Sequence, residues 1–193
     1  MKIYGEEISG NCLKVKYVAD YLGLSYEWID VDIVAGGSRT PEMLSKNPAG
    51  QVPFVEFDDG RILSQSNTII QFLAEESDLI PEDPFLRAKM MEWMFWEQYS
   101  HETAIAVARF RVIYQGQAVE DLDPQLVAKG NAALDLMEKH LINQEWFVGE
   151  RLSLADVALV AYTQFAEQPG FSLEARPNVR AWVPRVKAAL NCA

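Results

Sequence analysis

Ser9, Asn11 and Cys12 place a hydroxyl, an amide and a thiol within one short segment near the N-terminus. Hydroxyl and amide donors can hold a bound thiol as its thiolate, which is the reactive form. A free thiol has a pKa of about 8.5, and lowering that pKa by about 2 units takes roughly 2.7 kcal/mol. One hydrogen bond to a charged group contributes roughly 1.5–3 kcal/mol. The segment therefore predicts a thiolate site in which Ser9 is the main donor, Asn11 adds a second, and the positive helix N-terminus assists.

The same residues also fit a structural role. Serine and asparagine are good N-caps, so Ser9 and Asn11 could serve only to begin a helix. Cys12 could be a redox nucleophile, but its helical spacing with Val15 turns the thiol toward the core, where a thiol is inert. The second cysteine, Cys192, is far away in the sequence, so neither a disulfide framework nor a zinc site is expected.

The elements that must hold this segment alternate between strands and helices. Residues 2–5 are typical of a strand, and apolar positions recur at helical spacing over 12–22 before Gly23. The next elements are a strand at 26–32, a helix beginning at Thr40-Pro41, strands at 54–57 and 62–63 around Asp58-Asp59-Gly60, and a helix at 66–76. The order β-α-β-α-β-β-α predicts two parallel strands followed by an antiparallel hairpin.

The composition of the chain changes after this region. Residues 79–84 carry two prolines and are predicted to link a domain at 1–78 to a second domain at 85–193. The second domain is predicted to be all-helical, with helices at 85–114, 124–141, from 153 onward, and 178–190. The fold class is therefore a small α/β domain followed by a helical bundle. Arg109 and Arg111 fall in an apolar helix, where a buried charge is costly unless it is paired.

The bulk composition excludes several classes of protein. The 193 residues are 49% hydrophobic, which is enough for a packed core, and they carry a formal net charge of −11. This charge argues against a nucleic-acid surface and against binding to an anionic membrane. No run approaches the roughly 20 apolar residues of a membrane span, and the N-terminus lacks the apolar region of a signal peptide. We expect a cytoplasmic protein.

The order of elements and four local motifs resemble the cytosolic glutathione S-transferases over essentially the whole chain. The resemblance implies a thioredoxin-like N-terminal domain that binds glutathione and an all-helical C-terminal domain. Ser9 falls where serine-type classes such as theta have their catalytic serine. Ser9 and Asn11 together also resemble the bacterial nu-like class. The resemblance thus implies that these two residues activate the thiol of glutathione.

A second motif, Asn47-Pro48-Ala49-Gly50-Gln51-Val52-Pro53, resembles the segment in which this family has a cis Val-Pro peptide. The resemblance implies that Val52 and Pro53 expose backbone to the cysteinyl part of glutathione. It also makes Gln51 a candidate for the glycine end. Arg39 is a candidate for the glycine carboxylate. Taken alone, the segment would be an ordinary loop rich in proline and glycine.

A third motif, Gln65-Ser66, stands where the family commonly has an acid followed by serine, which bind the γ-glutamyl group. Backbone amides and a hydroxyl at a helix N-terminus suit a carboxylate. Gln65 can hydrogen-bond the ammonium but lacks the charge of the usual acid, so we expect modest affinity. The alternative is that this pair only caps a helix.

A fourth motif, Ser153-Leu154-Ala155-Asp156, is a variant of the capping box and opens a helix. It resembles the capping motif that the family places in its helical domain. Its expected role is structural, so it supports the family without naming a catalytic residue.

The resemblance implies a homodimeric glutathione transferase that acts in detoxification. It would conjugate the glutathione thiolate to small hydrophobic electrophiles, with glutathione as co-substrate and no metal. The implied partners are glutathione, the electrophile and a second copy of the chain, without nucleic acid or membrane. Two alternatives stay open: a nu-like glutathione-dependent disulfide-bond reductase, and a non-catalytic interaction protein with the same fold.

Overall fold

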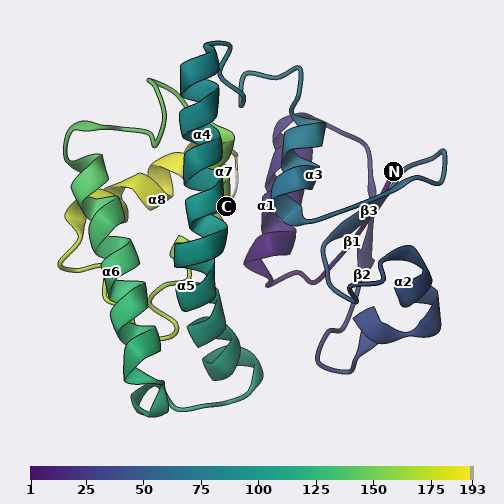
Figure 1. The fold of residues 1–193 in the computed structure, drawn as a ribbon, viewed down its shortest axis with the longest axis horizontal. Coiled ribbons are helices and arrows are strands. Elements are labelled where there is room, and N and C mark those ends of the chain that lie inside the picture. The colour runs from purple at the N-terminus through teal and green to yellow at the C-terminus, as the bar shows by residue number, and fades with distance from the viewer. Residues whose placement is uncertain (192–193) are drawn as a thin grey trace. The chain divides into compact units, whose positions relative to one another are not determined.

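The computed structural model describes residues 1–191, so Cys192 lies outside the described residues. The chain divides into two compact units, Met1–Ser77 and a second unit from Asp78 onward (Figure 1). Within the expected linker 79–84, Leu79 and Ile80 are buried, and the Leu79 carbonyl accepts a hydrogen bond from the Leu154 amide. These two apolar residues are why the segment belongs to the second unit.

The N-terminal unit is built on a four-stranded mixed sheet with the strand order β2-β1-β3-β4. The strands are β1 (Lys2–Gly5), β2 (Glu27–Asp30), β3 (Phe54–Glu56) and β4 (Ile62–Ser64). Its helices are α1 (Gly10–Tyr21), η1 (Gly37–Arg39), α2 (Pro41–Lys46) and α3 (Ser66–Leu73). Helices α1 and α3 pack together on one side of the sheet, and α2 lies on the other (Figure 1). The predicted β-α-β-α-β-β-α order is confirmed.

Local sequence signals explain where two of these elements begin and turn. Thr40 caps α2, because its hydroxyl accepts a hydrogen bond from the Met43 amide at 3.3 Å, and Pro41 occupies the first helical position. Gly60 has a φ of 82° in the turn between β3 and β4, a conformation that glycine adopts without strain. The helix predicted at 66–76 is shorter and ends at Leu73.

The C-terminal unit is all-helical, as predicted. Its α-helices are α4 (Pro84–Trp96), α5 (Glu102–Arg109), α6 (Pro124–His140), α7 (Leu154–Thr163) and α8 (Pro177–Ala189). The single helix expected at 85–114 is one helical stretch with two π-helical segments, η2 (Glu97–His101) and η3 (Phe110–Tyr114). Short 3₁₀ turns, η4 (Val119–Asp121) and η5 (Leu141–Asn143), flank α6.

Helix α7 forms the core of this unit, and every residue from Leu154 to Thr163 is buried. It packs against α4, α5 and α8. A helix that is apolar all round can lie only in such a surrounded position. The fourth motif therefore opens the central helix of the bundle.

Asp156, at the start of α7, ties three parts of the unit together. Its carboxylate accepts hydrogen bonds from the Ser153 amide and hydroxyl, at 3.1 and 3.0 Å, which closes the capping box. It also accepts from the Phe147 amide at 3.0 Å and from the Trp182 indole at 2.9 Å. Burial raises the pKa of Asp156 to about 6, against the lowering effect of these donors. The four donors compensate the cost of burying the carboxyl group.

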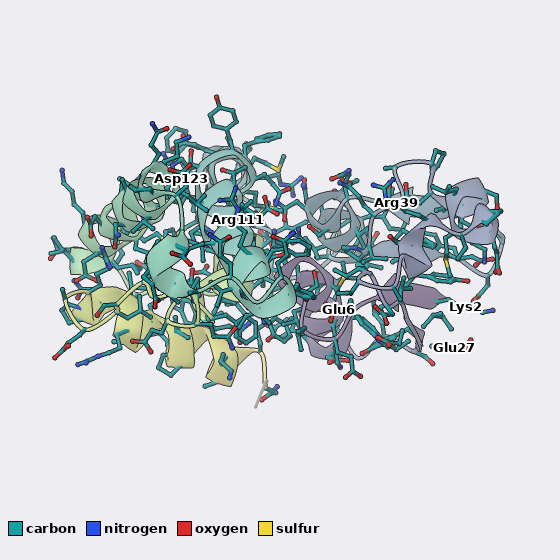
Figure 2. All side chains as sticks on the ribbon, turned by 90° about the horizontal axis from the view of Figure 1, so that it is seen from below. Lys2, Glu6, Glu27, Arg39, Arg111 and Asp123 are labelled. Carbon is teal, nitrogen blue, oxygen red and sulfur yellow. The ribbon has the colours of Figure 1, made fainter. Side chains whose placement is uncertain are left out.

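Arg109 is buried in the second unit with defined partners. Its Nε donates to Gln168 Oε1 at 2.7 Å, and its guanidinium lies 4.3 Å from the centre of the Phe165 ring. These contacts account for an arginine that is only 3% exposed. Arg111 is partly exposed (Figure 2).

We expect Asp156→Ala to lower the free energy of unfolding by about 3 kcal/mol, because it leaves four buried donors without their acceptor. Urea unfolding followed by circular dichroism measures this change. Glu167→Ala, at an exposed position of the same unit, should change it by less than about 0.5 kcal/mol. Equal stability of the Asp156 variant and the wild type would show that the carboxylate does not hold the unit together.

Candidate functional site

The strand register gathers the predicted site residues of the N-terminal unit at one edge of its sheet. Gly5 at the end of β1 pairs with Asp30 at the end of β2. Phe54 at the start of β3 pairs with Tyr4 and with Ser64 at the end of β4. The segments that continue from these positions carry the whole predicted set: Ser9, Asn11, Arg39, Gln51, Val52, Pro53, Gln65 and Ser66.

Ser9 is the N-cap residue of α1, with an extended backbone (φ −75°, ψ 121°), but its side chain makes no capping hydrogen bond. The side chain instead hydrogen-bonds Cys12, one turn into the helix. The Ser9 carbonyl accepts the first helical hydrogen bond, from the Leu13 amide at 2.9 Å. The hydroxyl therefore lies at the positive end of α1 without being used as a cap, unlike the purely capping role left open by the sequence.

Cys12 is fully buried, with 0% of its surface exposed. Burial raises the pKa of its thiol to about 11, although hydrogen bonding with the Ser9 side chain and with the Glu6 backbone lowers it in part. The end of β1 packs closely against Cys12, because a Cβ added to Gly5 would lie 3.2 Å from the Cys12 Cβ. A thiol that stays protonated and buried is a poor nucleophile.

Asn11 and Ser66 join the first and third motifs. The Ser66 hydroxyl donates to Asn11 Oδ1 at 3.1 Å, across 55 positions of the sequence. Ser66 is buried and Asn11 is partly buried. This hydrogen bond fixes the orientation of the Asn11 side-chain amide. Its oxygen faces Ser66 at the start of α3, and its NH₂ group points the other way.

Gln65 precedes α3 in an unusual conformation. Its φ of 72° lies in the left-handed region, which residues other than glycine rarely adopt, and its side chain makes no capping bond. Such strain is held in place by the surrounding structure and is concentrated at functional sites. The exposed Gln65 side chain is therefore poorly explained as a plain helix cap.

The second motif is held in shape by Asn47. Its Nδ2 donates to the Gln51 carbonyl at 2.8 Å, and its Oδ1 accepts from the Ala49 amide at 3.3 Å. The Val52-Pro53 peptide that follows is cis. Val52 packs against the core cluster that contains Tyr4. Asn47 thus shapes the candidate site in a way that the sequence did not assign, although asparagine before a Pro/Gly loop is a known turn signal.

Arg39 and Gln51 are both exposed, near the two ends of α2. Arg39 lies at the surface of the N-terminal unit (Figure 2). A Cβ on Gly50 would lie 3.3 Å from the Arg39 Cγ, so the Arg39 side chain runs beside the loop that carries Gln51. Gly50 has a φ of 62°, and its missing side chain permits this close approach.

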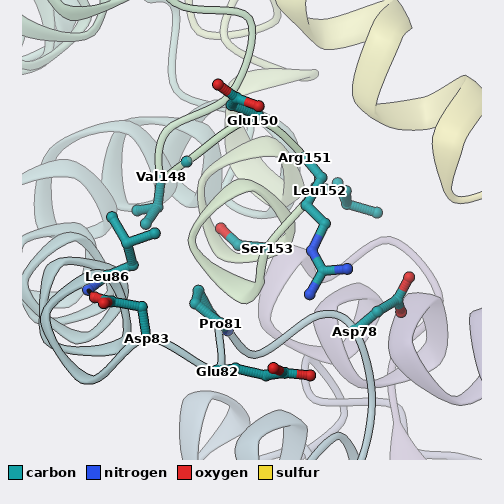
Figure 3. A pocket seen from close by; sticks show the side chains of 11 residues that line it. Asp78, Pro81, Glu82, Asp83, Leu86, Val148, Glu150, Arg151, Leu152 and Ser153 are labelled. Atoms are coloured by element: carbon teal, nitrogen blue, oxygen red, sulfur yellow. Dashed lines mark hydrogen bonds between the residues drawn. The ribbon is translucent and has the colours of Figure 1, made fainter.

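The C-terminal unit has a small pocket of its own (Figure 3). It is lined by residues of 78–86 and 148–153, and the Arg151 side chain points into the space between Pro81 and Asp78. Its volume of about 120 Å³ is well below the roughly 300–1,000 Å³ of a pocket for a drug-sized ligand. We therefore do not assign it to a tripeptide.

Over residues 1–191, no group of three or more His, Cys, Asp and Glu side chains is placed to hold a metal ion. Within the same range, no helix has the length and apolar character needed to cross a membrane.

Family models match both units of the chain. The model described as the glutathione S-transferase N-terminal domain matches residues 3–81, and the one for the C-terminal domain matches residues 91–189. The chain belongs to the glutathione S-transferase family. The resemblance found in the sequence is thereby confirmed at the level of the family.

Relatives of this glutathione S-transferase span most of its length. A crystal structure of a glutathione S-transferase from Pseudomonas fluorescens Pf-5 is 46% identical, with a TM-score of 0.93, covering 97% of this chain and 94% of that one. The glutathione S-transferase-like protein LUC7 of a Fusarium species is 30% identical over 95% of this chain and 87% of its own. The maleylacetoacetate isomerase of Pseudomonas aeruginosa PAO1 is 30% identical over 93% and 88%.

We expect Cys12 to resist alkylation in the folded protein. With a pKa of about 11, only about a thousandth of the thiol is ionised at pH 8, and the side chain is buried. The measurement is iodoacetamide labelling, read by mass spectrometry, of a Cys192→Ser variant in which Cys12 is the remaining cysteine. Labelling should be complete in urea and at least about 100-fold slower without it. Rapid labelling of the folded variant would contradict this expectation and would favour the alternative that Cys12 is a redox nucleophile.

Proposed function

We propose that this protein conjugates the thiolate of glutathione to small hydrophobic electrophiles. The observation that carries the proposal is the gathering of Ser9, the cis Val52-Pro53 peptide and Gln65-Ser66 at one sheet edge. A protein that used this fold only as an interaction scaffold would have no need of that set. Glutathione is the co-substrate, and the proposal requires no metal.

In this proposal each group takes one part of the tripeptide. The Ser9 hydroxyl donates to the cysteinyl sulfur, and Asn11 supplies a second donor from its amide nitrogen. Val52 pairs through its backbone with the cysteinyl residue. Gln65 and Ser66 bind the γ-glutamyl group, and Arg39 and Gln51 bind the glycine end.

The chemical step needs little from the protein beyond orientation and stabilisation of an anion. The thiol loses its proton to solvent, and the thiolate sulfur attacks the electrophilic carbon to form a carbon–sulfur bond. In a substitution the bond from that carbon to its leaving group breaks and the leaving group departs with the electron pair; in an addition the π bond breaks and its electron pair takes up a proton from solvent. Binding both reactants lowers the entropic barrier, and preorganised donors favour the thiolate over the thiol. Cys12 takes no part, since burial keeps it protonated.

The first test is calorimetric titration with reduced glutathione and then with oxidised glutathione. Binding of the reduced form with micromolar-to-millimolar affinity supports the proposed site and leads to an electrophile screen. Tighter binding of the disulfide would favour the glutathione-dependent disulfide reductase, in which thiols exchange between glutathione molecules. No binding of either form would contradict both enzymatic functions and favour the interaction protein. The screen should include cis–trans isomerisation of a maleyl compound, because one 30% identical relative is named an isomerase.

We expect Ser9→Ala to bind glutathione but to lower the rate at neutral pH about 10- to 100-fold. Loss of one hydrogen bond to the thiolate raises the pKa of the bound thiol by about 1–2 units, so less of it is ionised. The pKa is measured from the pH dependence of thiolate ultraviolet absorbance in the complex, beside the conjugation rate. Ser45→Ala, at an exposed position on α2, is the matched control and should change neither value. An unchanged rate in Ser9→Ala would show that Ser9 does not stabilise the thiolate, and it would favour Asn11 as the main donor.

We further propose that the protein is a cytoplasmic homodimer, joined through a surface groove of the C-terminal unit. The groove has a volume of about 600 Å³, with Trp96 and Tyr99 on one side and Lys129, Ala132 and Leu136 of α6 on the other. Tyr99 is 86% exposed, and Leu136 is 43% exposed. Exposed aromatic and apolar side chains gathered beside polar ones, as in this groove, are typical of a protein interface.

We expect sedimentation equilibrium to give about twice the 21.8 kDa mass of the chain. Ala132→Arg should shift the mass toward the monomer, because a long charged side chain enters the groove. Ala181→Arg, exposed on α8, should leave the mass unchanged. A wild-type protein that sediments as a monomer would contradict the homodimer.

A further inference from the structure

Helix α2 is held to the sheet by few side chains. None of its six residues is buried. Met43 packs on the cluster of Tyr4, Val31 and Phe54. Lys46, the last residue of the helix, adds polar contacts with Tyr4 and Glu56. The position of α2 therefore depends on the polar contacts of Lys46 more than the position of a well-buried helix would depend on such contacts.

Lys46, Tyr4 and Glu56 form a closed triad of hydrogen bonds. The Lys46 ammonium donates to the Tyr4 hydroxyl and to Glu56 Oε2, each at 2.7 Å. The Tyr4 hydroxyl donates to the same Glu56 oxygen at 2.7 Å. The hydrogen bond with Lys46 lowers the pKa of Glu56, and the reciprocal bond raises the pKa of Lys46, so both groups stay charged.

The triad joins three elements that meet at the proposed glutathione site. Tyr4 is in β1, Glu56 is in β3 and Lys46 ends α2. The Tyr4 ring stacks on Phe54 with centres 4.3 Å apart, and the Lys46 ammonium lies 4.8 Å from the centre of the Tyr4 ring. Phe54 directly follows the cis peptide. A shift of Lys46 would therefore move α2 relative to the start of β3.

The residues on both sides of α2 are those proposed for the glycine end of glutathione. Arg39 precedes the helix, and Lys46 is followed at once by Asn47, which shapes the loop of Gln51. The two side chains that would bind glycine are thus carried on either side of a helix that Lys46 fastens at one end. The γ-glutamyl contact at Ser66 and the hydroxyl for the cysteinyl sulfur at Ser9 are carried by other elements. The cysteinyl backbone contact at Val52 follows Gln51 in the loop, but Val52 is held by its own packing on the cluster that contains Phe54.

We propose that Lys46, Tyr4 and Glu56 are positioning residues that set the affinity of the site for the glycine end of glutathione. They act through Arg39 and Gln51 without touching the ligand. This inference rests on the proposed function, because it needs a site that binds glutathione.

The test compares glutathione with γ-glutamylcysteine, the dipeptide that lacks the glycine. In Lys46→Met we expect the dissociation constant for glutathione to rise about fivefold, in line with loss of a partly exposed ion-pair network. The dissociation constant for γ-glutamylcysteine should stay within about twofold, because this ligand lacks the glycine that would contact Arg39 and Gln51, and Val52 is anchored separately on the core cluster. Tyr4→Phe keeps the stacked ring and removes only the hydroxyl, so it should give the same pattern with a smaller change.

The control is Lys16→Met. Lys16 belongs to another triad in the same unit, of Lys, Asp and Tyr, and it donates to Asp20 at 2.7 Å and to the Tyr26 hydroxyl at 3.1 Å. It lies on α1, and its partners are not joined to α2. This variant should leave both dissociation constants unchanged.

Equal weakening of both ligands in Lys46→Met would overturn the inference, because it would indicate general loss of structure. Unchanged affinity for both ligands would overturn it as well. If Lys46→Met does not fold, the inference is tested by comparing the dissociation constants of Tyr4→Phe for glutathione and γ-glutamylcysteine. A wild-type protein that binds neither ligand contradicts the proposed function itself, whereas failure of the inference alone leaves glutathione binding by the wild type intact.

Discussion

Hydrogen bonding of β1 to two neighbours of opposite direction is the constraint on which the proposed site depends. β1 runs parallel to β2 and antiparallel to β3, and the registers bring Gly5, Asp30, Phe54 and Ser64 to one edge. Because side chains alternate along a strand, a shift of one residue would also move Tyr4 to the opposite face. The side chains proposed to bind glutathione would then no longer lie close together. The backbone pairing in the sheet therefore determines the relative positions of the segments that carry the proposed site residues.

The second unit has a comparable dependence on one group. Asp156 accepts four hydrogen bonds, including those of the Phe147 amide and the Trp182 indole, and so connects the start of α7 to the segment before it and to α8. Each unit thus relies on directional bonds at one place to fix elements that apolar packing alone would hold less specifically. Hydrophobic contact is not directional, whereas hydrogen bonds select one arrangement.

Local signals in the sequence predicted much of this fold. Thr40 caps the helix predicted to begin at Thr40-Pro41, and Gly60 lies in the predicted hairpin turn, since both act through nearby backbone. The left-handed backbone of Gln65 could not be predicted, because glutamine has no preference for it. The bond between Lys46 and Tyr4 joins positions 42 apart, and no local spacing signals such a contact. The cis Val-Pro peptide came only from the family resemblance, since few X-Pro bonds are cis.

The two π-helical segments have a consequence for the long helical stretch that contains α4 and α5. A π segment has the effect of one residue inserted into an α-helix, so each turns the rest of the helix by about 100°. The face that α5 presents is therefore out of phase with the face that an uninterrupted α-helix continuing from α4 would present. A single-residue deletion in Glu97–His101 would be expected to preserve helical content while moving His101 off Thr163, its buried partner at 2.9 Å. In this stretch, the number of residues between α4 and α5 determines the orientation of α5 as much as the types of those residues do.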